Sequence, residues 1–258
     1  MDALPVRSIL TGFDRLASPV TALASDYPSG GATPRHQHPT VQLIHAVHGV
    51  MVVSTDQGQW VVPPTRGLWM PARTDHWIRM VGNVKMRTAF IQPTAAPDLP
   101  TECTVLGISP LLRELILAAV EVRVPYAEDS RDGRLMRLLI DEVIHMPTLP
   151  LHLPQPSDAR LRALCDALSG ALDDNTTLAG WAARVGVDAK TIHRLFLRET
   201  GMNFSQWRQQ ARLLAALELL AAGARIVDIA LELGYASPTA FATMFRKQFG
   251  VPPSAYFR

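Results

Sequence analysis

The sequence predicts an α+β protein with a β-rich N-terminal domain, an intermediate helical segment and an all-α C-terminal domain. Three observations indicate this division. Short apolar runs separated by Gly, Pro, Asp and Asn fill the first hundred residues, and two amphipathic stretches follow. The last hundred residues contain one helical pattern in two copies. A chain of 258 residues is long enough for two domains.

Residues 1–100 have the spacing of an all-β domain. Their apolar runs, such as VQLIHAV and MRTAFIQP, recur about every ten residues and are rich in Val and Trp. This pattern predicts a β-sandwich or a β-barrel. Trp60, Trp69 and Trp77 are candidates for lining a ligand cavity, although aromatic side chains in a small barrel more often form its core.

A histidine motif lies inside this β-rich domain. It comprises Gly30-x5-His36-x-His38-x3-Gln42-x6-Gly49 and, further on, Pro71-x-Arg73-x2-His76. Over about residues 20–95 the chain thereby resembles the cupin superfamily, whose fold is a β-barrel. Gln42 stands where metal-binding cupins often carry Glu, and Arg73 replaces the usual glycine.

The cupin resemblance implies that His36, His38, Gln42 and His76 converge inside the barrel. Alternate residues of a strand share a face, so His36 and His38 would point the same way. Two uses fit these residues: an effector pocket formed by all four, or a divalent transition metal held by the three histidines. An amide is a poorer metal ligand than a carboxylate, which favours the pocket without a required cofactor.

Residues 104–147 form the predicted helical segment, with amphipathic stretches at 106–124 and 131–146. Each stretch carries an apolar stripe at helical spacing. The stripes consist of Leu111, Leu112, Leu115 and Ile116, and of Leu135, Leu138, Leu139 and Val143. They are compatible with packing on the sensor domain or with a homodimer contact. Residues 148–157 are rich in proline, which predicts an extended interdomain linker.

The two copies in residues 158–258 have the pattern of helix-turn-helix units. They span residues 182–207 and 230–256, and their spacings agree apart from one extra residue in the second turn. Gly186 and Gly234 end the first helix of each unit, where a positive φ is cheap for glycine. A long helix without Gly or Pro is expected between the units, at about residues 205–222.

The second helix of each unit has a buried and an exposed face. Asp188 and Ser237 are the predicted N-caps, and Pro238 suits the first helical position. The predicted core positions are Ile192, Leu195, Phe196, Phe241, Met244 and Phe245. The opposite face is the candidate DNA-reading surface, which comprises Lys190, His193, Arg194 and Arg198 in the first unit, and Thr239, Thr243, Arg246 and Lys247 in the second.

Residues from about 158 to 258 resemble the DNA-binding domain of the AraC/XylS transcriptional regulators. The most specific stretch begins at Gly234 with GYAS and continues through FRKQFGVPPS. The resemblance implies double-stranded promoter DNA and RNA polymerase as partners. It places base contacts at Lys190, His193 and Arg194 in the first unit and at Pro238, Thr239 and Thr243 in the second, with Arg246 near the DNA backbone.

Charge and composition limit the remaining choices. The net charge is only +2, and residues 158–258 carry 12 Lys+Arg against 9 Asp+Glu, a net +3. DNA binding must therefore depend on where the charges lie. Cys103 and Cys165 have no metal or disulfide spacing. Without a signal peptide or a long apolar segment, the protein is expected to be cytoplasmic and free of the membrane.

Together these features predict a sequence-specific DNA-binding transcriptional regulator, and not an enzyme, controlled by a small-molecule effector in the cupin-like domain. Two alternatives remain compatible with the sequence. In the first, the cupin-like domain only dimerises. In the second, which the absence of a carboxylate ligand disfavours, the chain is a metal-dependent cupin enzyme tethered to DNA.

Overall fold

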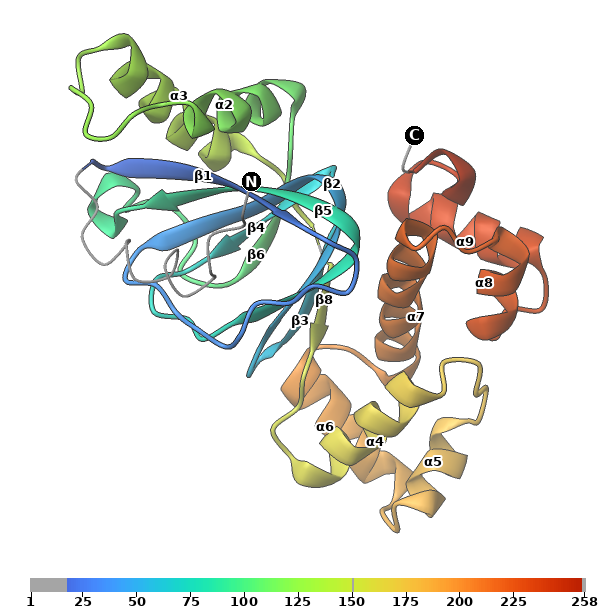
Figure 1. The fold of residues 1–258 in the computed structure, drawn as a ribbon. Coiled ribbons are helices and arrows are strands. Elements are labelled where there is room, and N and C mark those ends of the chain that lie inside the picture. Colours follow the sequence, from blue (N-terminus) through green and yellow to red (C-terminus); the bar gives the residue numbers. More distant parts are fainter. Residues whose placement is uncertain (1–17, 150, 257–258) are drawn as a thin grey trace. The chain divides into compact units, whose positions relative to one another are not determined.

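A computed structural model describes residues 18–149 and 151–256 (Figure 1). The chain divides into two compact units. The N-terminal unit reaches to Leu151, and the C-terminal unit comprises His152–Arg258 together with the short stretch Asp56–Gln59. Residues 1–17 of the predicted sensor domain lie outside the described residues.

The N-terminal unit is built on a curved, mainly antiparallel sheet (Figure 1). Its hydrogen-bonded order is β1-β5-β2-β4-β6-β7, and β3 pairs with β2 and β8. The strands are β1 (Val20–Tyr27), β2 (Val41–Thr55), β3 (Gly58–Val62), β4 (Arg66–Met70), β5 (Trp77–Ile91), β6 (Thr104–Gly107), β7 (Thr148–Leu149) and β8 (His152–Pro154). The predicted sheet-rich domain is confirmed.

The long strands β2 and β5 form the centre of this sheet. Their pairing shifts register on both sides of His48, and such irregularities bend a strand pair. Gly49 follows the shift with a φ of 78°. A Cβ at Gly49 would lie 2.4 Å from the Asn83 carbonyl oxygen, so the two strands approach this closely only with glycine there.

Helices α2 (Pro110–Val120) and α3 (Arg131–His145) cover one face of the sheet (Figure 1). Their buried residues join the sheet in one core, whose largest member is Trp69. Trp60 is also buried, whereas Trp77 is half-buried, with the Arg35 guanidinium 5.5 Å from the centre of its ring. The helices therefore do pack on the sheet, as one of the two interpretations predicts.

The predicted stripes on these helices are partly wrong. Leu106 and Gly107 belong to strand β6, and helix α2 begins only at Pro110. Leu111 and Leu138 are 49% and 42% exposed. The reason is the phase of each helix. The buried positions follow i, i+3, i+4 and i+7 spacing, namely Leu112, Leu115, Ile116 and Ala119 in α2 and Met136, Leu139, Ile140 and Val143 in α3.

The proline-rich segment 148–157 is extended and hydrogen-bonded. Strand β7 pairs with β6, and β8 pairs with β3. The Gln155 N–H donates to the Gln57 carbonyl at 2.9 Å. Proline has no N–H to donate, but the residues between the prolines can still pair. The division between the two units falls inside this segment, after Leu151.

The C-terminal unit is helical apart from β8 and the first residues of β3. Its helices are α4 (Ala159–Gly170), α5 (Leu178–Arg184), α6 (Ala189–Thr200), α7 (Phe204–Ala221), α8 (Ile226–Glu232) and α9 (Pro238–Phe249). Short 3-10 turns occupy Pro93–Ala95 in the first unit and Pro253–Ala255 in the second. Helices α5–α6 and α8–α9 are the two helix-turn-helix units, and α7 joins them (Figure 1). The predicted joining helix is thus confirmed, shifted by one residue.

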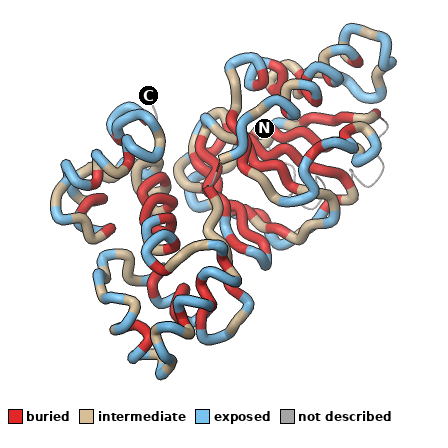
Figure 2. Tube along the Cα trace, turned by 180° about the vertical axis from the view of Figure 1, so that it is seen from behind, coloured by how far each residue is buried: buried red, intermediate tan, exposed pale blue. Residues whose placement is uncertain are grey.

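Helix α7 is the central helix of the C-terminal unit and joins its two helix-turn-helix motifs. Buried positions run along its length (Figure 2). Its N-terminus is closed by a capping box, in which the Asn203 side chain accepts from the Gln206 N–H and the Gln206 side chain from the Asn203 N–H. No helix within residues 18–149 and 151–256 combines the length and the apolar character needed to cross a membrane.

Candidate DNA interface and ligand site

The turn of the first helix-turn-helix unit agrees with its sequence pattern. Gly186 adopts a φ of 66° after helix α5. The Asp188 carboxylate accepts from the N–H groups of Lys190 at 2.9 Å and Thr191 at 3.2 Å, and so caps α6. Helix α6 ends at Gly201, which has a φ of 68°.

The second unit repeats this geometry. Gly234 adopts a φ of 68°, and the Ser237 hydroxyl accepts from the Ala240 N–H at 3.1 Å. Pro238 occupies the first turn of α9 as predicted. Unlike Gly186, Gly234 faces another part of the chain. A Cβ there would lie 2.7 Å from the Asp173 carbonyl oxygen.

The two recognition helices, α6 and α9, expose the predicted reading surface. All the predicted readers are exposed, namely Lys190, His193, Arg194, Arg198, Pro238, Thr239, Thr243, Arg246 and Lys247. The opposite faces are buried, at Ile192, Leu195, Phe196, Phe241 and Phe245. Met244 is the exception among the predicted core positions. It is only half-buried, because it lies at the edge of the apolar face of α9.

Ion pairs separate the cations of the C-terminal unit into two groups. Four arginines bind nearby carboxylates at 2.7–2.9 Å, namely Arg160, Arg184, Arg198 and Arg225. Three more donate to backbone carbonyls, namely Arg162, Arg208 and Arg212. Within the described part of this unit, the remaining cations are Lys190, Arg194, Arg246 and Lys247. Within residues 152–256, the cations without such a partner therefore all lie on α6 and α9, where they can meet phosphates or bases.

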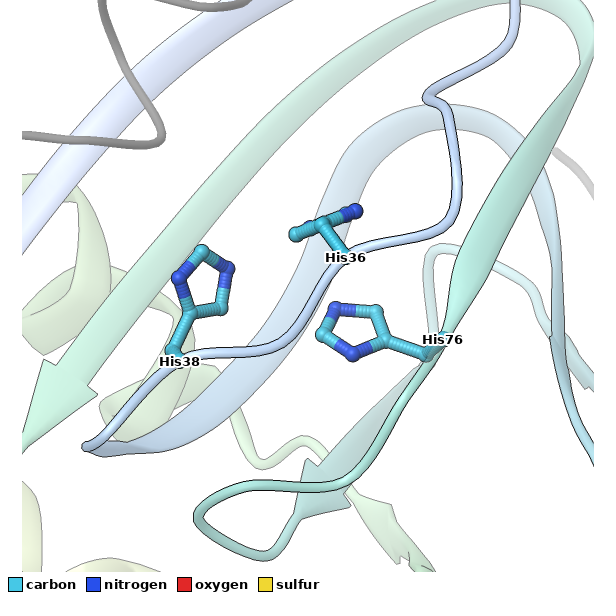
Figure 3. Close-up of side chains that lie close together, drawn as sticks. All are labelled: His36, His38 and His76. Carbon is cyan, nitrogen blue, oxygen red and sulfur yellow. The ribbon is translucent and has the colours of Figure 1, made fainter.

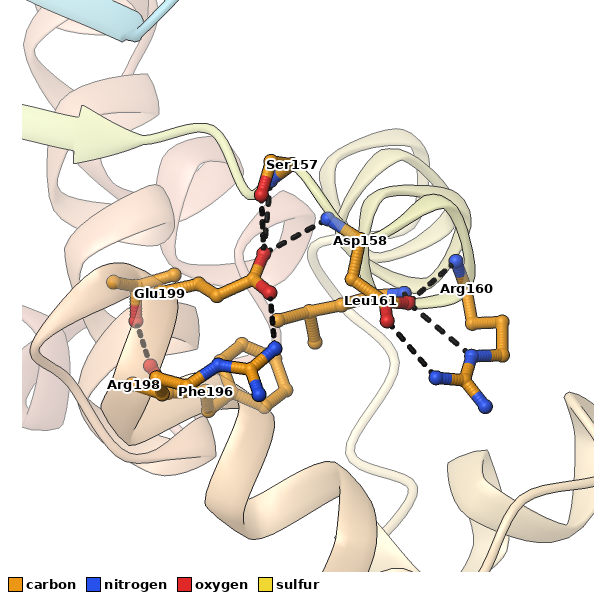
Figure 4. Close-up of polar contacts among 8 residues, drawn as sticks. Ser157, Asp158, Arg160, Leu161, Phe196, Arg198 and Glu199 are labelled. Carbon is orange, nitrogen blue, oxygen red and sulfur yellow. Dashed lines mark hydrogen bonds and ion pairs between the residues drawn. The ribbon is translucent and has the colours of Figure 1, made fainter.

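Glu199 fixes the C-terminal end of α6 (Figure 4). One of its carboxylate oxygens accepts from the N–H groups of Ser157 at 2.9 Å and Asp158 at 2.8 Å, directly before α4. The other accepts from Arg198 at 2.8 Å. The backbone N–H of Asp158 contributes most to holding the pKa of Glu199 below its usual value, and Arg198 adds to it. The sequence pattern gave no signal for this anchor.

In the N-terminal unit, His36, His38 and His76 lie together (Figure 3). One ligand atom from each lies within 4.8 Å of the others. The loop carrying His36 reaches the start of β5, where His36 and His76 exchange two backbone hydrogen bonds, at 2.9 and 2.8 Å. His36 and His38 lie in this irregular loop and outside the named strands, yet both side chains reach the cluster.

The protonation of the three rings follows from their surroundings. His36 Nδ1 lies 2.7 Å from the Pro34 carbonyl, and His76 Nδ1 lies 2.9 Å from the Thr74 carbonyl. A carbonyl only accepts, so Nδ1 carries the proton and Nε2 the lone pair in both rings. Burial lowers the pKa of His38 to about 3 and that of His76 to about 4, and it also lowers the pKa of His36. All three rings are therefore neutral at neutral pH.

Gln42 shares a small cavity with His36 and His38. The Thr88 hydroxyl donates to the Leu43 carbonyl at 3.0 Å, so it must accept from Gln42 Nε2, which lies 3.1 Å away. This leaves Gln42 Oε1 buried without a hydrogen-bond partner among the described residues. The cavity has a volume of about 30 Å³. The structure thus places His36, His38 and Gln42 around a space for a water-sized molecule, while His76 lies beside His36 and does not line this space.

Arg73, which stands where the cupin motif carries glycine, adopts a left-handed backbone conformation. Its φ is 60°, and it is the non-glycine residue with a positive φ among the described residues. Its N–H donates to the His38 carbonyl at 2.6 Å. This hydrogen bond holds the His38 backbone in place. The left-handed conformation that allows it costs a non-glycine residue about 1–2 kcal/mol.

A larger groove lies elsewhere in the N-terminal unit and has no signal in the sequence. It has a volume of about 500 Å³. Its walls include Val20 and Gln92 on the sheet side, and Tyr126, Met136 and Arg137 at and before α3. Its volume falls in the range of pockets for organic molecules, whereas that of the histidine cavity does not.

A sheet-rich ligand-binding domain followed by two helix-turn-helix units defines a class of DNA-binding regulators. The family described as AraC-like ligand binding domain matches residues 18–183, and the family described as helix-turn-helix domain matches residues 181–258. The chain therefore belongs to the AraC family of transcriptional regulators. It has a DNA-binding and a ligand-binding domain.

Two relatives, NimR and RipA, agree with this assignment. The chain is 36% identical to the HTH-type transcriptional regulator NimR of Escherichia coli (strain K12), over 87% of this chain and 82% of NimR. It is 33% identical to the HTH-type transcriptional regulator RipA of Corynebacterium glutamicum, over 51% of this chain and 38% of RipA. Among solved structures, ToxT from Vibrio cholerae is 11% identical, with a TM-score of 0.39 over 93% of this chain and 98% of ToxT.

Proposed function

We propose that this AraC-family regulator reads promoter DNA mainly through α6, while α9 chiefly positions the protein. The observation that carries the proposal is the distribution of free cations and long polar side chains. On α6, Lys190, His193 and Arg194 are exposed near the N-terminal half of the helix. Such positions on a recognition helix contact base edges in the major groove.

The second recognition helix offers different chemistry. Pro238, Thr239 and Thr243 are exposed on α9, but they reach less far and donate fewer hydrogen bonds than lysine or arginine. Arg246 and Lys247 lie in the last turn, where they suit phosphates better than base edges. Helix α7, with eighteen residues, is about 27 Å long, against about 34 Å between successive major-groove segments. One chain is thus long enough to address two adjacent grooves.

The N-terminal unit supplies the proposed control. A ligand held by His36, His38, Gln42 and His76 alters operator binding, and it does so only if it binds the two states of the regulator with different affinity. RNA polymerase is the proposed partner at the promoter, on the strength of family membership. A homodimer contact through α2 and α3 is proposed from the exposed apolar side chains Leu111, Leu138 and Ile144.

We propose no catalytic role for the histidine cluster. The named relatives are transcriptional regulators. A neutral amide, Gln42, stands beside the histidines in place of a carboxylate, and the nearby Asp75 carboxylate binds Arg35 at 3.0 Å. Among the described residues, the cluster therefore lacks a free carboxylate beside its imidazoles.

Mapping of bound sites across the genome, followed by binding assays on the recovered operator, tests the proposal. Purified full-length protein should bind that operator in preference to scrambled DNA. Arg194→Ala should lose about 1–3 kcal/mol of specific binding and should relax the preference at one base position. Unchanged affinity and preference in this variant would remove Arg194 from the proposed reading residues.

A further inference from the structure

We propose that Arg212 is a positioning residue, which holds the turn of the second helix-turn-helix unit against the loop before α5 and so sets the operator spacing that the protein accepts. The inference rests on the proposed function, because it takes α6 and α9 to enter two adjacent grooves. Three features of the C-terminal unit carry it: the limits of its apolar core, a buried guanidinium that joins three segments, and a groove beside that guanidinium.

One apolar core serves the first helix-turn-helix unit. It joins buried residues of α4, α5, α6 and the first half of α7, from Leu161 to Ala211. Within residues 152–256, none of its buried members lies on α8 or α9. The second unit follows α7 through a turn at Gly223, which has a φ of 82° and where a Cβ would meet nothing within 4 Å. The direction of α9 relative to α6 therefore depends on contacts outside this core.

Arg212 connects three segments from different parts of the C-terminal unit. It lies on α7 and is 8% exposed. Its Nε donates to the Leu172 carbonyl at 2.7 Å, and its Nη2 donates to Asn175 Oδ1 at 3.0 Å. The Asn175 amide in turn donates to the Gly234 carbonyl at 3.3 Å. A short chain of hydrogen bonds thus links α7, the loop before α5 and the turn before α9.

The turn of the second unit lies directly against these bonds. A Cβ at Gly234 would lie 2.7 Å from the Asp173 carbonyl oxygen and 3.0 Å from Arg212 Nη2. The centre of the Tyr235 ring lies 5.8 Å from the guanidinium carbon of Arg212. Ser237, which caps α9, follows Gly234 by three residues. Contacts that hold Gly234 therefore also place the N-terminal turn of α9, the part of a recognition helix that meets base edges.

The charge of Arg212 is poorly compensated. Within residues 152–256, no carboxylate forms an ion pair with it, and its partners are carbonyl and amide oxygens. Burial lowers the pKa of Arg212 and the neighbouring Arg208 adds to this, while Asp173 and Asp174 offset only a part. A buried charge is weak evidence for stability, and its best attested use is to fix one arrangement of packed elements. Arg212 therefore fits a positioning role better than a stabilising one.

Apolar packing leaves this joint partly open. A groove of about 320 Å³ lies beside Arg208 and Arg212, and its walls also include Tyr235 and Met244. Arg208 donates to the Thr176 carbonyl at 3.0 Å, so α7 binds the loop before α5 through two arginines. Hydrogen bonds are directional, and they favour one position of the second turn. Without them, the groove leaves this turn room to move.

The first test compares operators that differ in spacing. One base pair is inserted or deleted between the two half-sites of the recovered operator, which shifts a half-site by about 3.4 Å and rotates it by about 36°. Full-length protein is titrated by fluorescence anisotropy. The wild type should bind each altered operator about tenfold more weakly, the size of one lost base contact. In Arg212→Met this penalty should fall below about threefold, although binding to the native spacing weakens.

Further variants separate positioning from loss of folding. Asn175→Ala removes the bond to Gly234, leaves the backbone bonds of Arg212 in place, and should also weaken the dependence on spacing. Arg212→Lys keeps the charge and a donor, and should restore part of that dependence. Arg160→Ala is the matched control, because Arg160 pairs with Asp158 at the start of α4, and it should behave as the wild type. A merely structural role would weaken binding equally at every spacing, and that outcome would overturn the proposal.

A distance measurement tests the same joint without DNA. Spin labels are attached at Leu197→Cys on α6 and Gln248→Cys on α9, because both positions are exposed and lie outside the reading surface. The background carries Cys103→Ser, and Cys165 is buried. Pulsed electron paramagnetic resonance should give one narrow distribution of distances without further substitution. Arg212→Met should broaden it, while the helix content from circular dichroism stays the same.

The label distances and the operator titrations fail in different ways. Asn175→Ala is labelled alongside Arg212→Met, so that one variant with native helix content is measured in any case. A distribution as narrow as that of the parent protein in these variants would overturn the proposal. Specific operator binding by the wild type that does not depend on spacing would also overturn it. Equal binding to operator and scrambled DNA would refute the proposed function instead, while the label distances still decide the role of Arg212.

Discussion

The two helix-turn-helix units share one pattern but use it differently. At corresponding positions, α6 carries Lys190 and Arg194, where α9 carries Thr239 and Thr243. The turn of the first unit is open, since a Cβ at Gly186 would meet nothing within 4 Å. The turn of the second unit touches the Asp173 backbone. A duplicated motif has thus become one unit with a free reading surface and one that is also a packing element.

Packing around α7 explains this division. Arg212 on α7 is buried and donates to the Leu172 carbonyl at 2.7 Å and to Asn175 Oδ1 at 3.0 Å. The loop before α5 is thereby fixed beside Gly234. Asn175 also donates to the Gly234 carbonyl at 3.3 Å. The turn at Gly234 therefore packs against the loop before α5, so it connects the two helix-turn-helix units. A substitution in this turn is less easily accommodated than one at Gly186.

The largest expected effect comes from exchanging the two turn glycines for alanine. Gly234→Ala adds a Cβ within 2.8 Å of two Asp173 backbone atoms and also forces a left-handed alanine, so it should cost about 2–5 kcal/mol of unfolding free energy. Gly186→Ala pays only the conformational term, about 1–2 kcal/mol. Urea denaturation followed by circular dichroism measures both. Equal losses would show that the second turn does not pack as described.

Operator binding gives the next largest difference between the units. Arg194→Ala should lose about 1–3 kcal/mol of specific binding, because an arginine contact to a guanine edge would be removed. Thr243→Ala, at the corresponding position of α9, should lose about 1 kcal/mol or less, as expected for a single weaker contact. Fluorescence anisotropy on the mapped operator measures both. A larger loss for Thr243→Ala would reverse the proposed ranking of the two helices.

The sequence predicts the C-terminal unit well because its signals are local. Caps, positive-φ glycines and a 3.6-residue period act over a few residues, so Asp188, Ser237 and the limits of α7 follow from the chain itself. The exposed faces of α6 and α9 follow from the same period. Contacts between distant segments give no such signal. Glu199 accepts from the N–H of Asp158, some forty residues earlier in the chain and directly before α4. Only the structure reveals this contact.

In the N-terminal unit, the sequence predicts less of the structure, because more of it depends on contacts between distant segments. Its sheet-rich character follows from the spacing of apolar runs, but the phase of α2 and α3 was not fixed by that pattern, and Leu111 and Leu138 prove to be exposed. A leucine one residue away from the apolar stripe is rotated by about 100° out of the core. The histidines come together through a loop that pairs with the start of β5, at a separation of 40 residues between His36 and His76. In the sequence, only the resemblance to cupins indicated that these histidines lie close together.

The N-caps of the two recognition helices, α6 and α9, should differ by a smaller amount in their contribution to stability. The Asp188 side chain accepts from two N–H groups and carries a charge that favours a helix N-terminus, whereas the Ser237 side chain accepts from one and is neutral. Asp188→Ala should therefore lower the unfolding free energy by about 1–2 kcal/mol, and Ser237→Ala by about 0.5–1 kcal/mol. Denaturant titration measures the stabilities. The opposite order would mean that the second recognition helix depends more on its cap than the geometry indicates.

The last comparison tests Glu199, whose hydrogen bonds to Ser157 and Asp158 belong to the first helix-turn-helix unit. Glu199 corresponds to Gln248, which is exposed near the end of α9. Glu199→Gln should lower the unfolding free energy by about 1 kcal/mol at neutral pH, and Gln248→Ala should change it little.

The pH dependence of this difference identifies its cause. The pKa of Glu199 is depressed in the folded protein, first by the Asp158 N–H and then by Arg198. Its contribution to stability is therefore fully present above the pKa of an unfolded glutamate and is lost as the pH falls through the depressed folded value. The gap in unfolding free energy between wild type and Glu199→Gln should close over that acidic range. A gap that persists at low pH would mean that the glutamine variant fails through its shape, and that the charge on Glu199 does not hold α6 to the start of α4.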